Sequence, residues 1–198
     1  MARGTEGYAA EAAQLIPRYE SLDFAEVHAA VRPLLPRPPA SVVDIGAGTG
    51  RDAAALAAMG HRVLAVEPTA ELREAGQRLH PSPRLEWLDD ALPDLKHLVA
   101  RGERFDLVML VAVLMHLDQE ERARAMVPLC AAVAPGGLLY MTLRHGPVPP
   151  GRRMFEIADA EIIALTAAHD LTLALQESRG DMLGREGVTW SLLAFRRP

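Results

Sequence analysis

The sequence has one cysteine, no excess of basic residues and no long apolar stretch. These shortages argue against an internal disulfide, non-specific nucleic-acid binding and a membrane span. Cys130 alone cannot form an intramolecular disulfide, which favours a reducing compartment. A net charge of −5 at pH 7 argues against non-specific nucleic-acid binding, which needs a basic surface. No stretch approaches the roughly 18 apolar residues of a membrane span, and the N-terminus lacks the apolar segment of a signal peptide. We therefore expect a cytoplasmic protein that does not bind membranes.

The chain alternates between strand and helix patterns along its 198 residues, a length that suits one domain. Strands are expected at 41–45, 62–67, 84–88, 105–113, 138–144, 171–178 and 187–195, and helices at 25–35, 51–60, 69–80, 92–102, 119–137 and 159–170. This alternation predicts a mostly parallel sheet covered by helices on both faces. Only the turn-rich stretch SRGDMLGRE joins the last two strands, so one strand near the end must be antiparallel.

The stretch VVDIGAGTG, residues 42–50, carries Asp44 near the end of the first strand and continues with Gly46, Gly48 and Gly50. In an open parallel sheet, ligands bind beyond the carboxyl ends of the strands, where the strand order reverses. Glycine permits positive φ and lets a ligand approach the backbone closely. The stretch therefore predicts that a flat or bulky ligand crosses this loop.

Acidic residues at the strand ends narrow the choice of ligand. Glu67, followed by Pro68, ends the second strand, where a carboxylate can accept hydrogen bonds from a ribose diol. That feature alone fits both a nicotinamide cofactor and S-adenosylmethionine. Asp44 and Asp52 flank the glycines and would repel a pyrophosphate, whereas a ligand with sulfonium and ammonium groups gains from them. Arg51 also stands where the dinucleotide fingerprint has its last Gly or Ala. The pattern favours S-adenosylmethionine.

In this order, the motifs resemble those of the class I S-adenosylmethionine-dependent methyltransferases. The matching stretches are VVDIGAGTGRDAAALA, VLAVEPT, RLEWLDDALPDL, FDLVMLVAVLMHL and VAPGGLLYMTLR, and the resemblance runs from about residue 25 to the C-terminus. It implies a three-layer α-β-α Rossmann-like fold with a mostly parallel seven-stranded sheet, in the order 3-2-1-4-5-7-6 with strand 7 antiparallel. It also implies S-adenosylmethionine as cofactor and S-adenosylhomocysteine as product.

The resemblance assigns roles residue by residue. Asp44 would lie beneath the methionine part of the cofactor, Glu67 would bind both ribose hydroxyls, and Asp89 would accept from the adenine amino group. Asp90 aligns almost as well as Asp89, and the pair could instead cap the following helix. The other residues expected beside the cofactor are Gly46, Ala47, Gly48, Gly50, Pro68, Ala91, Val111 and Ala112.

Two histidines are candidates for proton transfer or for orienting the acceptor. His116 follows the fourth strand in LMHL, and His145 follows the fifth in LRHG. The alternative for His116 is a structural histidine that supports the cofactor loop. These histidines are far apart in sequence and no cluster has metal-ligand spacing, so no metal is expected.

The flanks of the chain supply the remaining candidates. Within a single domain of residues 1–198, we expect residues 1–40 to form a helical segment or lid, 41–145 the cofactor-binding half and 146–198 the acceptor-side half. Tyr19 would fold over the cofactor with this lid, unless the segment is a helix packed on the sheet edge. Arg144 or Arg152, in LRHGPVPPGRRMF, would bind an anionic group on the acceptor, unless the loop is simply solvated.

A small-molecule methyltransferase that works by in-line displacement is therefore the favoured interpretation. A methyltransferase acting on protein or RNA, or a non-catalytic protein or oxidoreductase of similar fold, remains an alternative. The stretch VAVLMHL stands where enzymes that methylate DNA bases carry an NPPY-type tetrapeptide, so DNA is not expected as a partner. The sequence is compatible with a monomer or a homodimer.

Overall fold

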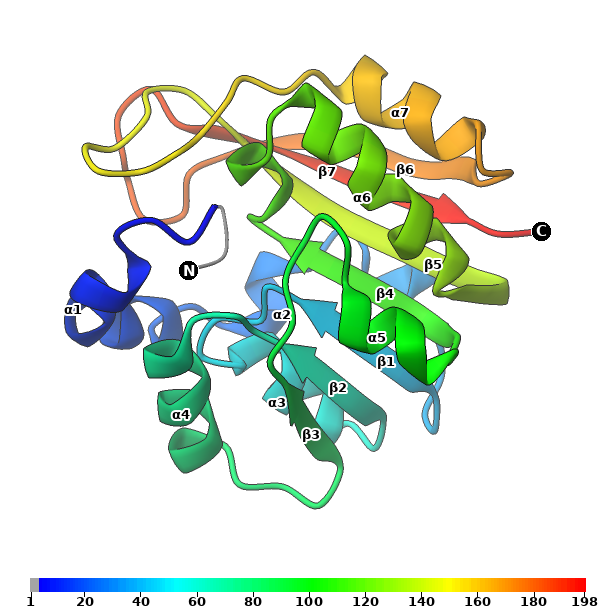
Figure 1. Ribbon diagram of the computed structural model, residues 1–198, viewed down its shortest axis with the longest axis horizontal. Helices are drawn as coiled ribbons and strands as arrows, with labels where there is room; N and C mark the ends of the chain where they lie inside the picture. The colour runs from blue at the N-terminus through cyan, green and yellow to red at the C-terminus, as the bar shows by residue number, and fades with distance from the viewer. Residues whose placement is uncertain (1–3) are drawn as a thin grey trace.

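One seven-stranded sheet runs through residues 4–198, the part of the chain that the computed structural model describes (Figure 1). Its order is β3-β2-β1-β4-β5-β7-β6, and β7 runs antiparallel to both β5 and β6. The strands are β1 (Ser41–Ile45), β2 (Arg62–Val66), β3 (Leu85–Leu88), β4 (Phe105–Val111), β5 (Val133–His145), β6 (Thr172–Gly180) and β7 (Thr189–Arg196). The predicted fold class and strand order are confirmed.

Helices cover both faces of the sheet and divide the core into two layers. One layer includes Leu98 of α5, Met126 of α6 and Ile162 of α7, and the other includes Phe24 of α2 and Leu56 of α3. The helices are α1 (Tyr8–Glu20), α2 (Phe24–Val27), α3 (Arg51–Ala58), α4 (Ala70–Leu79), α5 (Lys96–Arg101), α6 (Gln119–Ala131) and α7 (Asp159–Ala167), with short 3-10 turns η1 (Arg32–Leu34) and η2 (Leu114–His116). The central strands are apolar on both faces because both faces are covered.

Local sequence explains where the helices begin. Asp118 accepts from the backbone N–H of Glu121, and Glu121 reaches back to the N–H of Asp118, which forms a capping box at the start of α6. Asp23 accepts from the N–H of Glu26 in the same way at α2.

Three predicted helices are wrong in extent. The helix expected at 92–102 begins only at Lys96. The helix expected at 25–35 ends at Val27, and Pro33 lies in the separate turn η1. The helix expected at 119–137 ends at Ala131, because the next residues join the sheet. The N–H of Phe105 donates to the carbonyl of Ala132, and Phe105 pairs with Val133. Tertiary pairing thus overrides local helix propensity.

The carboxyl ends of the parallel strands meet at one edge of the sheet, on the left in Figure 1. Helix α1, the loop at 146–158 and the segment at 181–188 lie over this edge (Figure 1). Among residues 4–198, no helix has the length and apolarity to cross a membrane.

Candidate functional site

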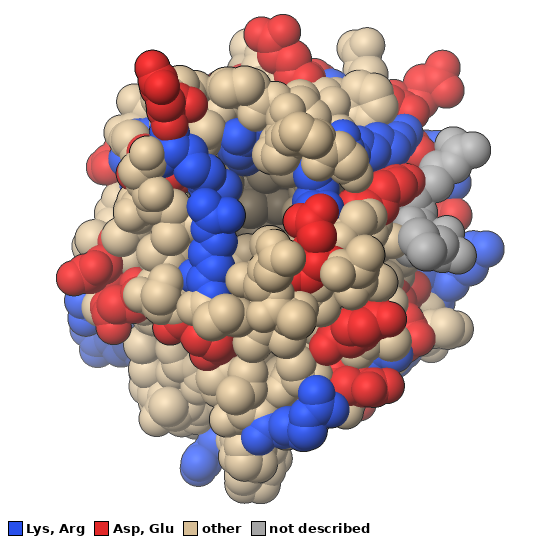
Figure 2. Space-filling model, turned by 90° about the vertical axis from the view of Figure 1, so that its left-hand side faces the viewer, with Lys and Arg blue, Asp and Glu red and all other residues tan. Residues whose placement is uncertain are grey.

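A cavity of about 260 Å³ opens at the carboxyl edge of the sheet. Its walls come from the loops after β1, β2, β3 and β4, from the ends of β5 and β6, and from α1. Figure 2 shows this face of the molecule, with a central hollow and Lys or Arg side chains at its rim. The fold thus brings segments that are distant in sequence to one site, as expected for this sheet type.

The loop after β1 presents bare backbone to the cavity. Gly46 and Gly48 have φ values of 73° and 59°, in the left-handed region that favours glycine. A Cβ on Gly46 would lie 2.6 Å from Cγ2 of Val113, so this position has no room for a side chain. Ala47 lines the cavity between them.

Glu67 lies at the end of β2 and is only 5% exposed. Its two carboxylate oxygens accept from the backbone N–H of Gly48 at 2.8 Å and of Thr69 at 2.7 Å. Burial raises the pKa of Glu67, and these hydrogen bonds oppose the rise. Each carboxylate oxygen keeps a further lone pair, so Glu67 can still accept hydrogen bonds from a ligand.

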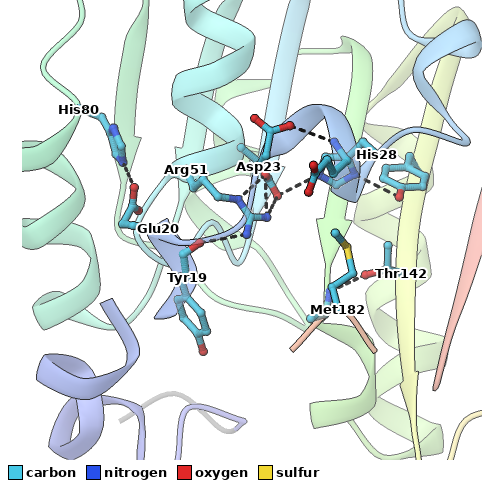
Figure 3. A network of polar contacts seen from close by, with 12 residues as sticks. Tyr19, Glu20, Asp23, His28, Arg51, His80, Thr142 and Met182 are labelled. Atoms are coloured by element: carbon cyan, nitrogen blue, oxygen red, sulfur yellow. Dashed lines mark hydrogen bonds and ion pairs between the residues drawn. The ribbon is translucent and has the colours of Figure 1, made fainter. Parts of the chain in front are cut away.

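A buried polar network surrounds the start of α3 (Figure 3). Asp52 accepts two hydrogen bonds from Arg51, both at 2.8 Å, and forms an ion pair with Nε2 of His28 at 3.1 Å. Burial alone would raise the pKa of Asp52, but His28 and Arg51 lower it below its usual value. The other ring nitrogen of His28 lies 3.2 Å from the Tyr140 hydroxyl. Asp52 is therefore an ionised acid close to the cavity.

Asp44 lines the cavity without a comparable partner. It is 2% exposed, and burial and then the charge of Asp52 raise its pKa well above 3.8. Arg51 offsets part of this rise. A cation placed in the cavity would favour the ionised form of Asp44.

The two acids after β3 have different positions. Asp90 lines the cavity and accepts from the N–H of Ala91 at 2.9 Å and of Leu98 at 2.8 Å. The side chain of Asp89 is 67% exposed and pairs with Arg73 outside the cavity lining. The structure thus places Asp90, and not Asp89, in the cavity wall, and Asp90 also accepts from an N–H in the first turn of α5. Which of the two acids would contact adenine stays a prediction.

Most of the other residues expected beside the cofactor lie in the cavity wall. These are Pro68, Ala91, Val111 and Ala112. Gly50 does not belong to the wall, and a Cβ there would lie 2.5 Å from Cη2 of Trp87. Gly50 thus packs against Trp87, and its place beside the cofactor stays a prediction.

His116 lies in the cavity wall, 7% exposed, within η2. Its Nδ1 is 2.8 Å from the carbonyl oxygen of Arg153, which can only accept, so this nitrogen carries a proton. Burial lowers the pKa of His116, which keeps the ring neutral near pH 7. Its Nε2 is then an acceptor, and the Tyr8 hydroxyl donates to it at 2.9 Å. Tyr8 was missed because no motif marks this position.

His145 does not line the cavity. Its Nε2 lies 2.8 Å from the Ser191 hydroxyl, on the neighbouring strand β7. The structure therefore does not bring His145 together with His116 in the cavity wall, and a catalytic role for it stays an untested prediction.

Helix α1 lies against the glycine loop. Tyr19 is in the cavity wall, and a Cβ on Gly48 would be 3.7 Å from its ring. Arg51 donates to the backbone carbonyl of Tyr19, and His80 of α4's C-cap pairs with Glu20 at 3.1 Å (Figure 3). Polar contacts thus hold the C-terminal end of α1 against both α3 and α4.

The two arginines expected to bind the acceptor have different positions relative to the cavity. Arg144 lines the cavity and is 6% exposed. Arg152 donates to both carboxylate oxygens of Glu11, at 3.1 and 2.7 Å, and covers the ring of Tyr8. This pairing joins the 146–158 loop to α1 through the guanidinium of Arg152, and acceptor binding by Arg152 stays an untested prediction.

No group of three or more His, Cys, Asp or Glu side chains within residues 4–198 has the geometry to hold a metal ion.

The strand order, the antiparallel β7 and the cavity beyond β1 and β2 define the Rossmann-like fold of the class I methyltransferases. Residues 42–137 match the protein family described as "Methyltransferase domain". The chain carries a class I S-adenosylmethionine-dependent methyltransferase domain and is an enzyme of this class. No curated protein matches the chain.

Three solved structures illustrate the likeness in fold. The magnesium protoporphyrin IX methyltransferase of Synechocystis PCC 6803, with bound SAM, has a TM-score of 0.69 and 18% identity over 88% of this chain and 78% of that one. The 1,6-didemethyltoxoflavin-N1-methyltransferase of Burkholderia thailandensis has a TM-score of 0.63 and 21% identity over 96% and 87%. A putative methyltransferase of Haloferax volcanii, in complex with the Trm112 activator, has a TM-score of 0.73 and 16% identity over 98% of each chain.

Proposed function

We propose that this enzyme transfers the methyl group of S-adenosylmethionine to a small-molecule acceptor. The observation that carries the proposal is the covered cavity. Helix α1 and the 146–158 loop meet above it through the pair of Arg152 and Glu11, and the cavity wall includes Gly4, Thr5 and Tyr8 from the N-terminal side. A folded protein or RNA acceptor would need an open groove. Two of the similar structures are methyltransferases of magnesium protoporphyrin IX and of 1,6-didemethyltoxoflavin, which supports a small acceptor.

The cofactor half of the cavity fits S-adenosylmethionine in shape and charge. The bare backbone at Gly46 and Gly48 would lie along it, Glu67 would accept from its ribose, and Asp90 would lie beside its adenine. Asp44 and Asp52 would face its positively charged methionine end. When bound, the cofactor would supply a methyl group on a positively charged sulfur.

The residues of the chain would then align the acceptor and manage its proton. Positioning alone can supply roughly 7–11 kcal/mol of a barrier. Neutral His116, protonated at Nδ1, offers Nε2 as a base through the Tyr8 hydroxyl. An acceptor O–H or N–H that donates to the Tyr8 oxygen could pass its proton to Nε2 of His116 through the phenol. Burial raises the pKa of Tyr8, so the phenol stays neutral and can serve in this relay.

Three segments of the chain would have different roles. Residues 1–40, of which 1–3 lie outside the described part, would cap the cofactor, with Tyr19 against the glycine loop. Residues 41–145 would bind the cofactor and 146–198 would shape the acceptor side. The buried, unpaired Cys130 fits the proposed cytoplasmic location.

The acceptor class can be tested with methyl-labelled S-adenosylmethionine. A cell extract is separated into small molecules, protein and RNA, and each fraction is incubated with the purified enzyme. The proposal requires label in the small-molecule fraction, and a His116→Ala variant should transfer less label. Label that appears only in protein or RNA would contradict a small-molecule acceptor.

A further inference from the structure

A row of three side chains crosses the sheet on the acceptor side of the cavity. Arg144 of β5 lies opposite Trp190 of β7, and Trp190 lies opposite Arg179 of β6. Directly opposed residues on neighbouring strands point to the same face of a sheet. All three side chains line the cavity, so the row forms one wall of it.

Arg144 has no carboxylate partner although it is almost fully buried. It donates to the carbonyl oxygens of Gly146, at 3.5 Å, and Pro147, at 2.8 Å, and its Nε has no hydrogen-bond partner. Burial and then the charge of Arg185 lower the pKa of Arg144. A buried guanidinium without an opposite charge is costly, so an anion in the cavity would relieve this cost.

Arg179 is only partly buried, but within residues 4–198 it likewise has no carboxylate partner. Its Nη1 donates to Sδ of Met182, and a thioether is a weak acceptor. Its Nε is buried without a partner. The arginines of the 146–158 loop and the 181–188 segment do have carboxylate partners, namely Arg152 with Glu11, Arg153 with Asp118 and Glu121, and Arg185 with Asp181.

Asp181, which accepts a hydrogen bond from Trp190 of the row, already has a cationic partner. Asp181 accepts from the guanidinium of Arg185 and from Nε1 of Trp190, and these donors hold its pKa low. It therefore pairs directly with Arg185. Its charge also acts on Arg144, but within residues 4–198 neither Arg144 nor Arg179 forms an ion pair with a carboxylate. Met154 and Leu183 contribute apolar side chains to the same cavity wall.

We infer that this chamber binds an acceptor with an apolar body and an oxyanion, and that Arg144 and Arg179 hold the oxyanion on either side of Trp190. The inference rests on the proposed small-molecule methyl transfer and adds the chemical class of the acceptor and a second recognition residue, Arg179. A carboxylate and a phosphate ester share the required chemistry, because both match the planar fork of arginine. The apolar body would lie against Trp190, Met154 and Leu183.

The experiment uses three probes that share a phenyl ring: benzoate, phenyl phosphate and the neutral benzamide. Each is titrated into the ¹⁵N-labelled protein without cofactor, and the indole N–H signals are followed by NMR. The chain has two tryptophans, of which only Trp190 lines the cavity, so Trp87 is an internal reference. We expect benzoate or phenyl phosphate to shift the Trp190 signal with saturation, and benzamide to leave it in place.

Arg179→Gln is the matched variant, because Arg179 lies on the edge strand β6 and outside the proposed cofactor contacts. It should weaken binding of the anionic probe roughly 10-fold or more, whereas Arg78→Gln, at an exposed position on α4, should leave it unchanged. The affinity of Arg179→Gln for S-adenosylmethionine should equal that of the wild type.

The inference is overturned if neither anion shifts the Trp190 signal, if benzamide shifts it as much, or if Arg179→Gln binds the anion like the wild type. A protein that binds S-adenosylmethionine but no anionic probe overturns this inference alone. A protein that binds the anion but not S-adenosylmethionine overturns the proposed function and supports the anion site. Tighter binding of benzoate than of phenyl phosphate, or the reverse, shows whether the acceptor's oxyanion is a carboxylate or a phosphate ester.

Discussion

Single residues divide the cavity into two sides of opposite charge. Asp44, Glu67 and Asp90 line the side beyond β1, β2 and β3, whereas Arg144 and Arg179 line the side formed by β5 and β6. His116 lies in the wall with both groups, and the charge of Arg144 contributes to its lowered pKa. This division suits a cationic cofactor on one side and an anionic acceptor on the other.

Glu67→Gln tests the ribose contact. The variant keeps one carbonyl oxygen for a backbone N–H but loses the charge, so S-adenosylmethionine and S-adenosylhomocysteine should both bind about 1.5–3 kcal/mol more weakly. Both ligands carry the same ribose, so the two losses should be equal. Calorimetry measures them, with Glu71→Gln on the exposed side of α4 as the control. Unchanged affinity would remove Glu67 from the site.

Asp44→Asn should weaken cofactor binding and stabilise the free protein. The pKa of Asp44 is raised in the folded state, so its ionisation costs stability as pH rises through that pKa. At pH 8 the variant should be about 0.5–2 kcal/mol more stable than the wild type. Well below pH 3.8, the ordinary pKa of the group, the difference should vanish, because the carboxyl is then protonated in both the folded and the unfolded state.

Thermal unfolding as a function of pH measures this effect, and titration with S-adenosylmethionine measures the loss of affinity. A variant that is less stable than the wild type at pH 8, yet binds the cofactor normally, would show that Asp44 has a structural role instead.

At the scale of elements, α1 and the 146–158 loop act as one cover because Arg152 joins them. Arg152→Ala removes both hydrogen bonds to Glu11 and the contact with the Tyr8 ring. We expect hydrogen exchange in residues 8–20 to become roughly 5- to 30-fold faster, which corresponds to about 1–2 kcal/mol. The cofactor dissociation constant should rise, while exchange in β4 should not change. Equal exchange in α1 before and after the substitution would contradict this link.

The order of the elements could be predicted from sequence, but some boundaries and contacts could not. The β-branched run at 41–45 and the capping residues mark their elements locally. The end of α6 depends instead on the pairing of Val133 with Phe105, which is distant in sequence. Asp44 and Glu67 carry a recognisable pattern, whereas the positions of Tyr8 and Arg152 depend on how two covering segments meet. Local patterns carry no information about such contacts.

At the scale of the whole molecule, cofactor binding should stabilise the fold, because the cavity draws on β1, β2, β4 and β5 together. S-adenosylmethionine at 100 times its dissociation constant should add about 2.7 kcal/mol to the free energy of unfolding. For a chain of 198 residues this corresponds to a rise in Tm of roughly 5–10 °C. Differential scanning fluorimetry measures it, and an unchanged Tm would contradict binding to the folded state.

The central claim is that the cavity binds S-adenosylmethionine. Its most direct test is calorimetric titration of the purified protein with S-adenosylmethionine and, in a separate experiment, with NAD. The acids Asp44 and Glu67 around a bare glycine loop favour a cationic ligand with a ribose and disfavour a pyrophosphate. The account predicts one site with a micromolar dissociation constant for S-adenosylmethionine and no measurable heat with NAD. Binding of NAD together with no binding of S-adenosylmethionine would contradict it.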